Sequence, residues 1–81
     1  MILSIIIPVY NEESTVINVL NKIKESLENK FKYEVIVIND GSNDNTGKIL
    51  DENQNLIDKK IKNETNRGKG YSVKKGLDSA D

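Results

Sequence analysis

The apolar residues of the chain fall into short runs that predict buried β-strands. Residues Ile2 to Val9 are nearly all apolar, rich in isoleucine and too few for a typical helix. Tyr33 to Ile38 repeats this pattern with valine and isoleucine. Such runs are typical of strands covered on both faces, as in a parallel sheet. Pro8 cannot donate to a strand ladder, so the first strand should end near it. A third strand is predicted around Leu56 to Lys62.

The segment after the first strand carries the periodicity of an amphipathic helix. Its apolar residues recur at helical spacing, at Val16, Leu20, Ile23 and Leu27. Ser14 or Thr15 is placed to cap this helix, and we expect the helix to fade around Asn29 and Lys30.

Two further helices are predicted from the remaining polar and apolar positions. One should begin between Asn43 and Gly47, in a run rich in turn-forming and cap-forming residues. The other should run from Tyr71 towards the end of the chain, with an apolar side made of Val73, Leu77 and Ala80.

The alternation of strands and helices predicts an α/β fold, a parallel sheet of about three strands joined by right-handed crossovers. In open sheets of this kind, ligands bind beyond the carboxyl ends of the strands. Three polar loops should meet there, with the sequences "PVYNE", "NDGSND" and "NRGKG". Their convergence at one edge of the sheet predicts a binding site.

The composition excludes several kinds of chemistry. The chain has no cysteine, so disulfides and thiolate metal sites are absent, and no histidine, the commonest general base. Its 12 basic and 13 acidic residues give a net charge of -1, which offers no electrostatic footprint for nucleic acid or an anionic membrane. The apolar N-terminal run is too short to span a bilayer, and we expect an intracellular, cytoplasmic protein.

The three loops offer complementary binding groups. Tyr10 presents an aromatic face, and Glu12 a carboxylate that accepts from ribose hydroxyls. Asp40 is placed to accept a hydrogen bond from a ring N–H of uracil or guanine. Arg67 and Lys69 flank a glycine and are suited to neutralise phosphate. Together these groups predict a site for a nucleoside diphosphate.

Each of these residues also has a purely structural interpretation. Pro8 terminates a strand, Tyr10 sits on a half-buried rim, Glu12 complements a helix dipole, and Arg67 and Lys69 are solvated loop charges. For Asp44 we favour a turn or cap role, which is the structural alternative for Asp40 as well. No glycine-rich dinucleotide fingerprint follows the first strand, and no Walker A loop is present.

Three stretches in order carry a family resemblance: "SIIIPVYNEEST", "YEVIVINDGSNDNTGKIL" and "NRGKGYSVKKGLDSAD". Together they resemble the N-terminal part of a family 2 glycosyltransferase of the GT-A fold, a Rossmann-like three-layer arrangement, closest to the dolichyl- or polyprenyl-phosphate sugar transferases. The resemblance implies a nucleotide-binding role for residues at seven positions. These are Pro8, Tyr10, Glu12, Ile38, Asp40, Arg67 and Lys69.

The chain departs from the family pattern in two places. The family usually has two aspartates before the glycine of its second motif, and here the first of them is Asn39, whose acceptor oxygen can preserve a structural hydrogen bond. The family's Asp-x-Asp motif, which holds a divalent cation (Mg or Mn), is expected beyond Asp81. Residues 1–81 are therefore interpreted as the N-terminal nucleotide-sugar-binding portion of the domain, without catalytic residues or metal ligands, and we expect this portion to be inactive alone.

The resemblance implies a full-length enzyme that transfers a sugar from a UDP- or GDP-sugar donor to a lipid-phosphate or glycan acceptor. Such an enzyme is expected in the cytoplasm or at the cytoplasmic face of the membrane. An unpaired sheet edge of this portion would be open to self-association. The alternative is a non-enzymatic, doubly wound binding module of receiver-like type. Against it, the first strand ends in Pro8 and Tyr10, where a receiver domain needs an acidic pair.

Overall fold

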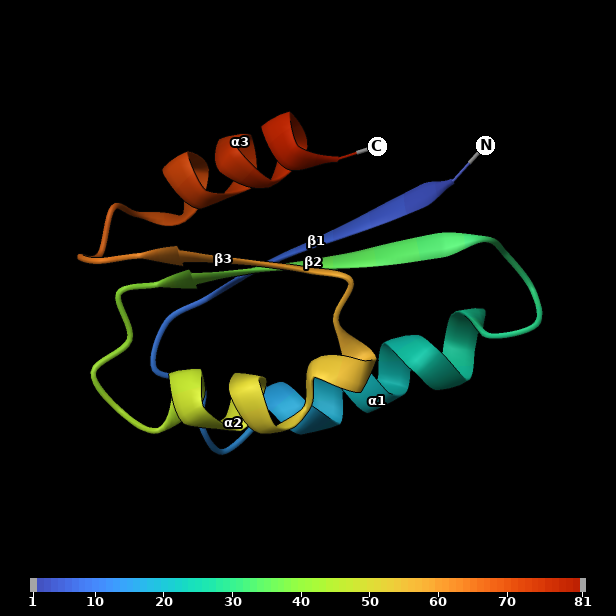
Figure 1. The fold of residues 1–81 in the computed structure, drawn as a ribbon, viewed down its shortest axis with the longest axis horizontal. Helices are drawn as coiled ribbons and strands as arrows, with labels where there is room; N and C mark the ends of the chain where they lie inside the picture. The colour runs from blue at the N-terminus through green and yellow to red at the C-terminus, as the bar shows by residue number, and fades with distance from the viewer. Residues whose placement is uncertain (1, 81) are drawn as a thin grey trace.

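The computed structural model describes residues 2–80 as a sheet between two layers of helices (Figure 1). The strands are β1 (Leu3–Val9), β2 (Tyr33–Asp40) and β3 (Lys59–Asn63), and the helices are α1 (Val16–Leu27), α2 (Thr46–Glu52) and α3 (Lys69–Ser79). A short 3-10 turn, η1 (Gln54–Leu56), precedes β3. Helices α1 and α2 cover one face of the sheet, and α3 covers the other. The α/β prediction is confirmed.

All strands are parallel, in the order β1-β2-β3. The central strand β2 is buried from Glu34 to Asp40, as expected for a strand with a neighbour on each side and helices on both faces. In the register, Val9 lies opposite Asn39, and Asp40 lies opposite Asn63. The third strand starts later than predicted, at Lys59, because Leu56 belongs to η1 and residues 57 and 58 connect η1 to the strand.

The face of the sheet towards α1 and α2 holds an apolar cluster of Val9, Val16, Leu20, Val35, Val37 and Leu50. Because side chains alternate along a strand, the odd-numbered residues of β2 belong to this face and the even-numbered ones to the other. Thr15 occupies the N-cap position of α1 without a side-chain cap bond. Its hydroxyl donates to Oε2 of Glu12 instead, at 2.9 Å.

The buried side of α3 differs from the prediction. Leu77 is 60% exposed, whereas Ser72 is fully buried and Gly76 is buried as well. A Cβ built on Gly76 would lie 2.5 Å from Cγ2 of Ile6 and 2.9 Å from Cδ1 of Ile38. The prediction was wrong for Leu77, while Val73 and Ala80 are half-buried. The helix α3 approaches the sheet closely at Ser72 and Gly76, where only small side chains fit.

We expect Gly76→Ala to lower the free energy of unfolding by about 1–3 kcal/mol, because the added methyl overpacks the contact of α3 with the sheet. Gly70→Ala is the matched control. It lies in the same helix, and a Cβ added there would have nothing within 4 Å, so the better helix propensity of alanine should leave stability unchanged or raise it by up to about 1 kcal/mol. Urea unfolding of both variants measures the difference, and equal losses in the two would contradict the packing argument.

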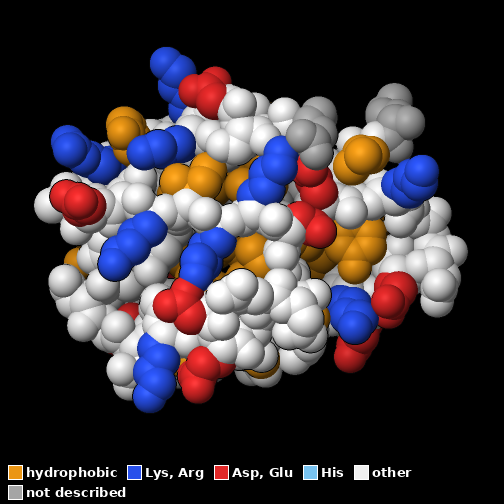
Figure 2. Space-filling model, viewed as in Figure 1, with side chains coloured by type: hydrophobic (Ala, Val, Ile, Leu, Met, Phe, Trp, Pro, Cys, Tyr) orange, Lys and Arg blue, Asp and Glu red, His pale blue; other side chains and the backbone are white. Residues whose placement is uncertain are grey.

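The two edges of the sheet differ in character. The β3 edge carries Lys59, Lys60 and Lys62, and lysines on an edge strand discourage further pairing. On the face drawn in Figure 2, basic side chains are interspersed with acidic ones, and apolar side chains show between them. The β1 edge is apolar, with Leu3 43% exposed, and it has no partner strand among residues 2–80. Self-association through a sheet edge stays a prediction, and this is the edge it concerns.

Candidate functional site

A pocket of about 240 Å³ lies at the carboxyl ends of β1 and β2, where the loops gather on the left of Figure 1. It is lined by Pro8, Val9, Tyr10, Glu12, Asp40, Asn66, Gly68 and Lys69. These residues come from three segments that are far apart in the sequence, one at the end of each strand or just after it. Five of the seven predicted site residues are among them, and the exceptions are Ile38 and Arg67.

Asp40 lines this pocket and is 3% exposed. Its Oδ1 accepts hydrogen bonds from Nδ2 of Asn63 and from the backbone N–H of Arg67, both at 2.8 Å. Its Oδ2 accepts from the backbone N–H of Gly68 at 3.0 Å. The carboxylate therefore holds the loop after β3 against the end of β2, a structural role that exists beside any ligand contact.

The pKa of the Asp40 carboxyl lies below its ordinary value of 3.8. Burial alone would raise the pKa, because it removes the charged form from water. The donors from Arg67, Asn63, Gly68 and Ser72 favour the charged form and outweigh burial. Asp40 is consequently ionised at neutral pH and can only accept hydrogen bonds.

Gly41 allows the loop after β3 to lie directly over the end of β2. Its φ is +71°, in the left-handed region that favours glycine. A Cβ at this position would lie 2.5 Å from the backbone N of Asn66 and 2.5 Å from the carbonyl carbon of Thr65. The absence of a side chain at Gly41 thus makes room for the segment that delivers Arg67 and Gly68 to Asp40.

The loop after β1 is tied to the loop after β2. The backbone N–H of Asn11 donates to Oγ of Ser42 at 3.0 Å, and Oδ1 of Asn11 accepts from the backbone N–H of Asn43 at 2.8 Å. Asn39 accepts from the backbone N–H of Ser42 at 3.2 Å through its side-chain oxygen. The predicted structural hydrogen bond at Asn39 is therefore present.

Asp44 has the turn role favoured for it. Its Oδ1 accepts from the backbone N–H of Thr46 at 2.9 Å, at the start of α2. Burial would raise the pKa of Asp44, but hydrogen bonds from the hydroxyl and amide of Thr46 lower it by more. The pKa therefore lies below its ordinary value. Asp44 also reaches the other loop, since its Oδ2 lies 3.4 Å from the backbone N of Glu13.

The two predicted site residues outside the pocket lining have other surroundings. Ile38 is completely buried, and its Cδ1 lies under Gly76 of α3. The guanidinium of Arg67 lies 5.9 Å from the centre of the Tyr71 ring, and Nζ of Lys75 lies 5.5 Å from the same centre. Tyr71 was not among the predicted site residues. Its four-residue separation from both cations was the available signal, because it places them within reach of the ring.

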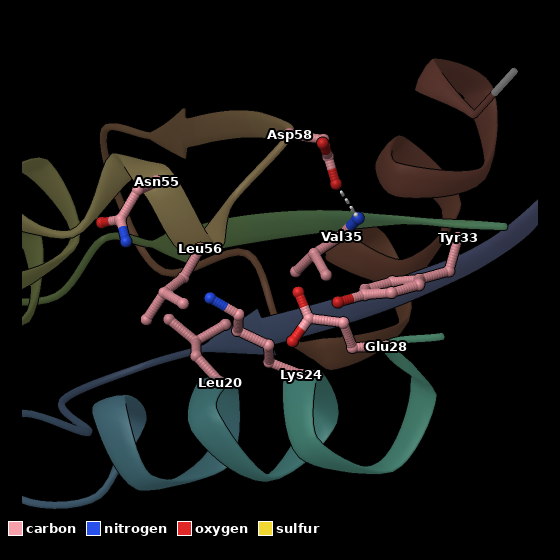
Figure 3. A pocket seen from close by; sticks show the side chains of 8 residues that line it. All are labelled: Leu20, Lys24, Glu28, Tyr33, Val35, Asn55, Leu56 and Asp58. Carbon is pink, nitrogen blue, oxygen red and sulfur yellow. Dashed lines mark hydrogen bonds between the residues drawn. The ribbon is translucent and has the colours of Figure 1, made fainter. Parts of the chain in front are cut away.

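A second hollow, of about 260 Å³, lies at the amino end of β2 (Figure 3). Its side chains come from α1, the start of β2 and η1, and they include Lys24, Glu28 and Tyr33. Asp58 at its rim accepts from the backbone N–H of Val35 at 2.6 Å. This hollow lies away from the carboxyl ends of the strands, and none of the predicted site residues lines it.

A parallel sheet between helical layers, with a polar pocket beyond its strand ends, is the arrangement of the GT-A class of α/β proteins. Residues 4–81 match the family model described as glycosyl transferase family 2. The chain belongs to that family.

Similar proteins include enzymes whose names specify lipid-phosphate sugar transfer. A dolichyl-phosphate beta-glucosyltransferase of Dictyostelium discoideum is 38% identical over 90 residues, covering 93% of this chain and 26% of that protein. An undecaprenyl-phosphate 4-deoxy-4-formamido-L-arabinose transferase of Proteus mirabilis is 41% identical over 59 residues, covering 72% of this chain and 18% of that protein.

The crystal structure of residues 1–349 of S. aureus TarS in complex with UDP superimposes on the whole chain. The TM-score is 0.85 at 31% sequence identity, and the match covers 25% of the TarS chain. The chain thus spans between 18% and 26% of the length of these relatives.

The divalent cation expected from the family has no ligand set in the described part of the chain. Residues 2–80 contain no group of three or more acidic side chains that could hold a metal ion. A cation site with ligands outside this part stays a prediction. No helix within residues 2–80 has the length and apolar character needed to cross a membrane.

Proposed function

We propose that the pocket beyond β1 and β2 binds the nucleoside diphosphate part of a UDP- or GDP-sugar. In a longer polypeptide, the sugar would pass to a lipid-phosphate or glycan acceptor at the cytoplasmic face of the membrane. The observation that carries the proposal is Asp40, a buried and ionised carboxylate that lines the pocket. Family membership and the UDP complex of a similar protein support it.

The accepting capacity of Asp40 suits the imide N–H of uracil or guanine. A carboxylate offers about four lone-pair positions. The chain fills two at Oδ1, from Asn63 and Arg67, and one at Oδ2, from Gly68. The Ser72 hydroxyl also hydrogen-bonds to the carboxylate, so a ligand N–H would share the Asp40 oxygens with donors of the chain.

The remaining pocket residues are suited to contact the base, the ribose and the diphosphate of the ligand. Tyr10 is 42% exposed at the rim of the pocket and offers its ring for stacking on the base. One oxygen of the Glu12 carboxylate accepts from Thr15, and the other is available to ribose hydroxyls. Lys69 lines the pocket beside Gly68, where it would neutralise the diphosphate with help from Arg67.

Titration of the chain with UDP and with CDP tests the proposal. The two nucleotides differ on the base edge, where uracil presents N3–H and cytosine presents an unprotonated N3. We expect UDP to bind at least about tenfold more tightly, because the N3 lone pair of cytosine faces an ionised carboxylate. GDP, which carries N1–H, tests the second donor class. Isothermal titration calorimetry gives the affinities.

Two results would count against this function. One is the absence of binding by both UDP and GDP. The other is equal affinity for UDP and CDP, which would remove Asp40 from base recognition. The family assignment does not depend on either result, since it rests on the sequence match and the fold.

A further inference from the structure

The backbone that carries Glu12 into the pocket is held by side chains that do not line the pocket. Residues 11–13 are hydrogen-bonded to the side chains of Ser42, Asp44 and Thr46 and to the backbone N–H of Asn43, in the loop after β2 and at the first residue of α2. None of these four partners belongs to the pocket lining. The position of one pocket wall is therefore set from outside the pocket.

Within this set of four partners, Thr46 is hydrogen-bonded to a residue that lines the pocket, Glu12. Thr46 is completely buried, and its Oγ1 accepts from the backbone N–H of Glu12 at 2.9 Å. The same Oγ1 donates to Oδ1 of Asp44 at 2.5 Å. Because the ionised carboxylate accepts the hydrogen bond of the hydroxyl, the hydroxyl hydrogen points to Asp44. The lone pairs of Oγ1 then face the backbone N–H of Glu12. Asp44 thus orients Thr46, and Thr46 fixes Glu12.

The neighbouring contacts leave little freedom for an alternative arrangement. Oδ2 of Asp44 lies 3.4 Å from the backbone N of Glu13, the next residue along the chain. Asn11, which precedes Glu12, has a φ of +51°. It both donates a hydrogen bond to the loop after β2 and accepts one from it. A left-handed conformation at a non-glycine residue persists only where its surroundings enforce it.

We propose that Asp44 and Thr46 are positioning residues of the nucleotide site, acting through the backbone of Glu12 on recognition of the ribose. This inference rests on the proposed function and deepens it. Neither residue lines the pocket. Their effect is specific to the wall that carries Glu12, so base recognition by Asp40 stays intact when they are altered.

The test compares UDP with 2′,3′-dideoxy-UDP, which lacks both ribose hydroxyls. In the unaltered chain UDP should bind more tightly. In Thr46→Val, which removes the hydroxyl and keeps the shape, UDP affinity should fall about fivefold to tenfold, while the dideoxy nucleotide binds as before. Thr46→Ser retains the hydroxyl and should restore most of the preference. Ser14→Ala, an exposed hydroxyl in the same loop, is the control and should change neither affinity.

A readout without ligand separates this inference from the proposed function. The Glu12 amide should exchange its hydrogen faster in Thr46→Val than in Thr46→Ser, because only the serine variant can accept that N–H. If the unaltered chain binds no UDP, the proposed function fails, while the exchange measurement still shows whether the link exists.

If UDP binds and Thr46→Val keeps both the affinity and the preference for ribose hydroxyls, the inference is overturned. Should Thr46→Val fail to fold, Asp44→Ala decides. It removes the acceptor that orients the Thr46 hydroxyl, and a ribose preference equal to that of the unaltered chain would refute the positioning role.

Discussion

Replacing Asp40 by asparagine should lower the free energy of unfolding by about 1–3 kcal/mol and weaken UDP binding about tenfold. Asparagine can still accept from Asn63 and Arg67 through one oxygen. Its amide group must then face the backbone N–H of Gly68, so that two donors oppose each other in a buried site. The loss is large for a chain of this size, whose total stability is expected to be about 4–12 kcal/mol.

Denaturant unfolding and UDP titration measure the two effects of Asp40→Asn. The matched control is Asp78→Asn, the same replacement at an exposed position of α3, which should leave stability within about 0.5 kcal/mol. A variant that loses stability while binding UDP with unchanged affinity would assign Asp40 to the loop alone.

The difference in stability between the unaltered chain and Asp40→Asn should depend on pH, with a sign set by the pKa of Asp40. The pKa of Asp40 is lowered in the folded state. At pH values near and below the ordinary pKa, the unfolded chain therefore binds more protons than the folded chain. The stabilisation is therefore complete above about pH 4 and is lost as the pH falls through the folded-state pKa. The advantage of the unaltered chain over Asp40→Asn should shrink on acidification, and a constant difference down to about pH 2 would contradict this account.

Gly41→Ala should destabilise the protein by about 2–4 kcal/mol, through two separate penalties. The first is conformational, because alanine is disfavoured at a φ of +71°. The second is steric, because the methyl group would lie 2.5 Å from backbone atoms of Thr65 and Asn66. Backbone atoms cannot turn aside as a flexible side chain can, so the loop after β3 must move away from Asp40.

Gly68→Ala separates these two penalties. Gly68 also has a positive φ, of +92°, but a methyl group added there would have nothing within 4 Å. It should therefore show the conformational cost alone, about 1–3 kcal/mol. Thermal unfolding of both variants gives the comparison. A loss in Gly68→Ala as large as that in Gly41→Ala would show that the close approach to residues 65 and 66 contributes nothing.

The strands and the first helix were predictable because their signals are local. The apolar runs of β1 and β2 and the spacing of Val16 and Leu20 depend only on neighbouring residues. The buried face of α3 was not predictable in the same way. Ser72 and Gly76 are buried because the helix lies close to the sheet, and small residues carry no hydrophobic signal that would reveal it.

The site was predictable as a meeting of loops, because the carboxyl ends of parallel strands must share one edge of the sheet. The internal bonds of the site were not. Asp40 accepts from Arg67, 27 residues further along the chain, and Thr46 accepts from Glu12 across the two loops. Such pairs depend on how the loops are placed relative to one another in three dimensions, which neither residue spacing nor composition reveals.

The pocket walls come from three segments that meet only when the whole sheet is assembled. No partly folded form could keep the pocket, and binding and folding are therefore thermodynamically linked. A nucleotide at about 100 times its dissociation constant would add about 2.7 kcal/mol to the stability of the chain. The fraction of folded chains would therefore rise with the concentration of the nucleotide.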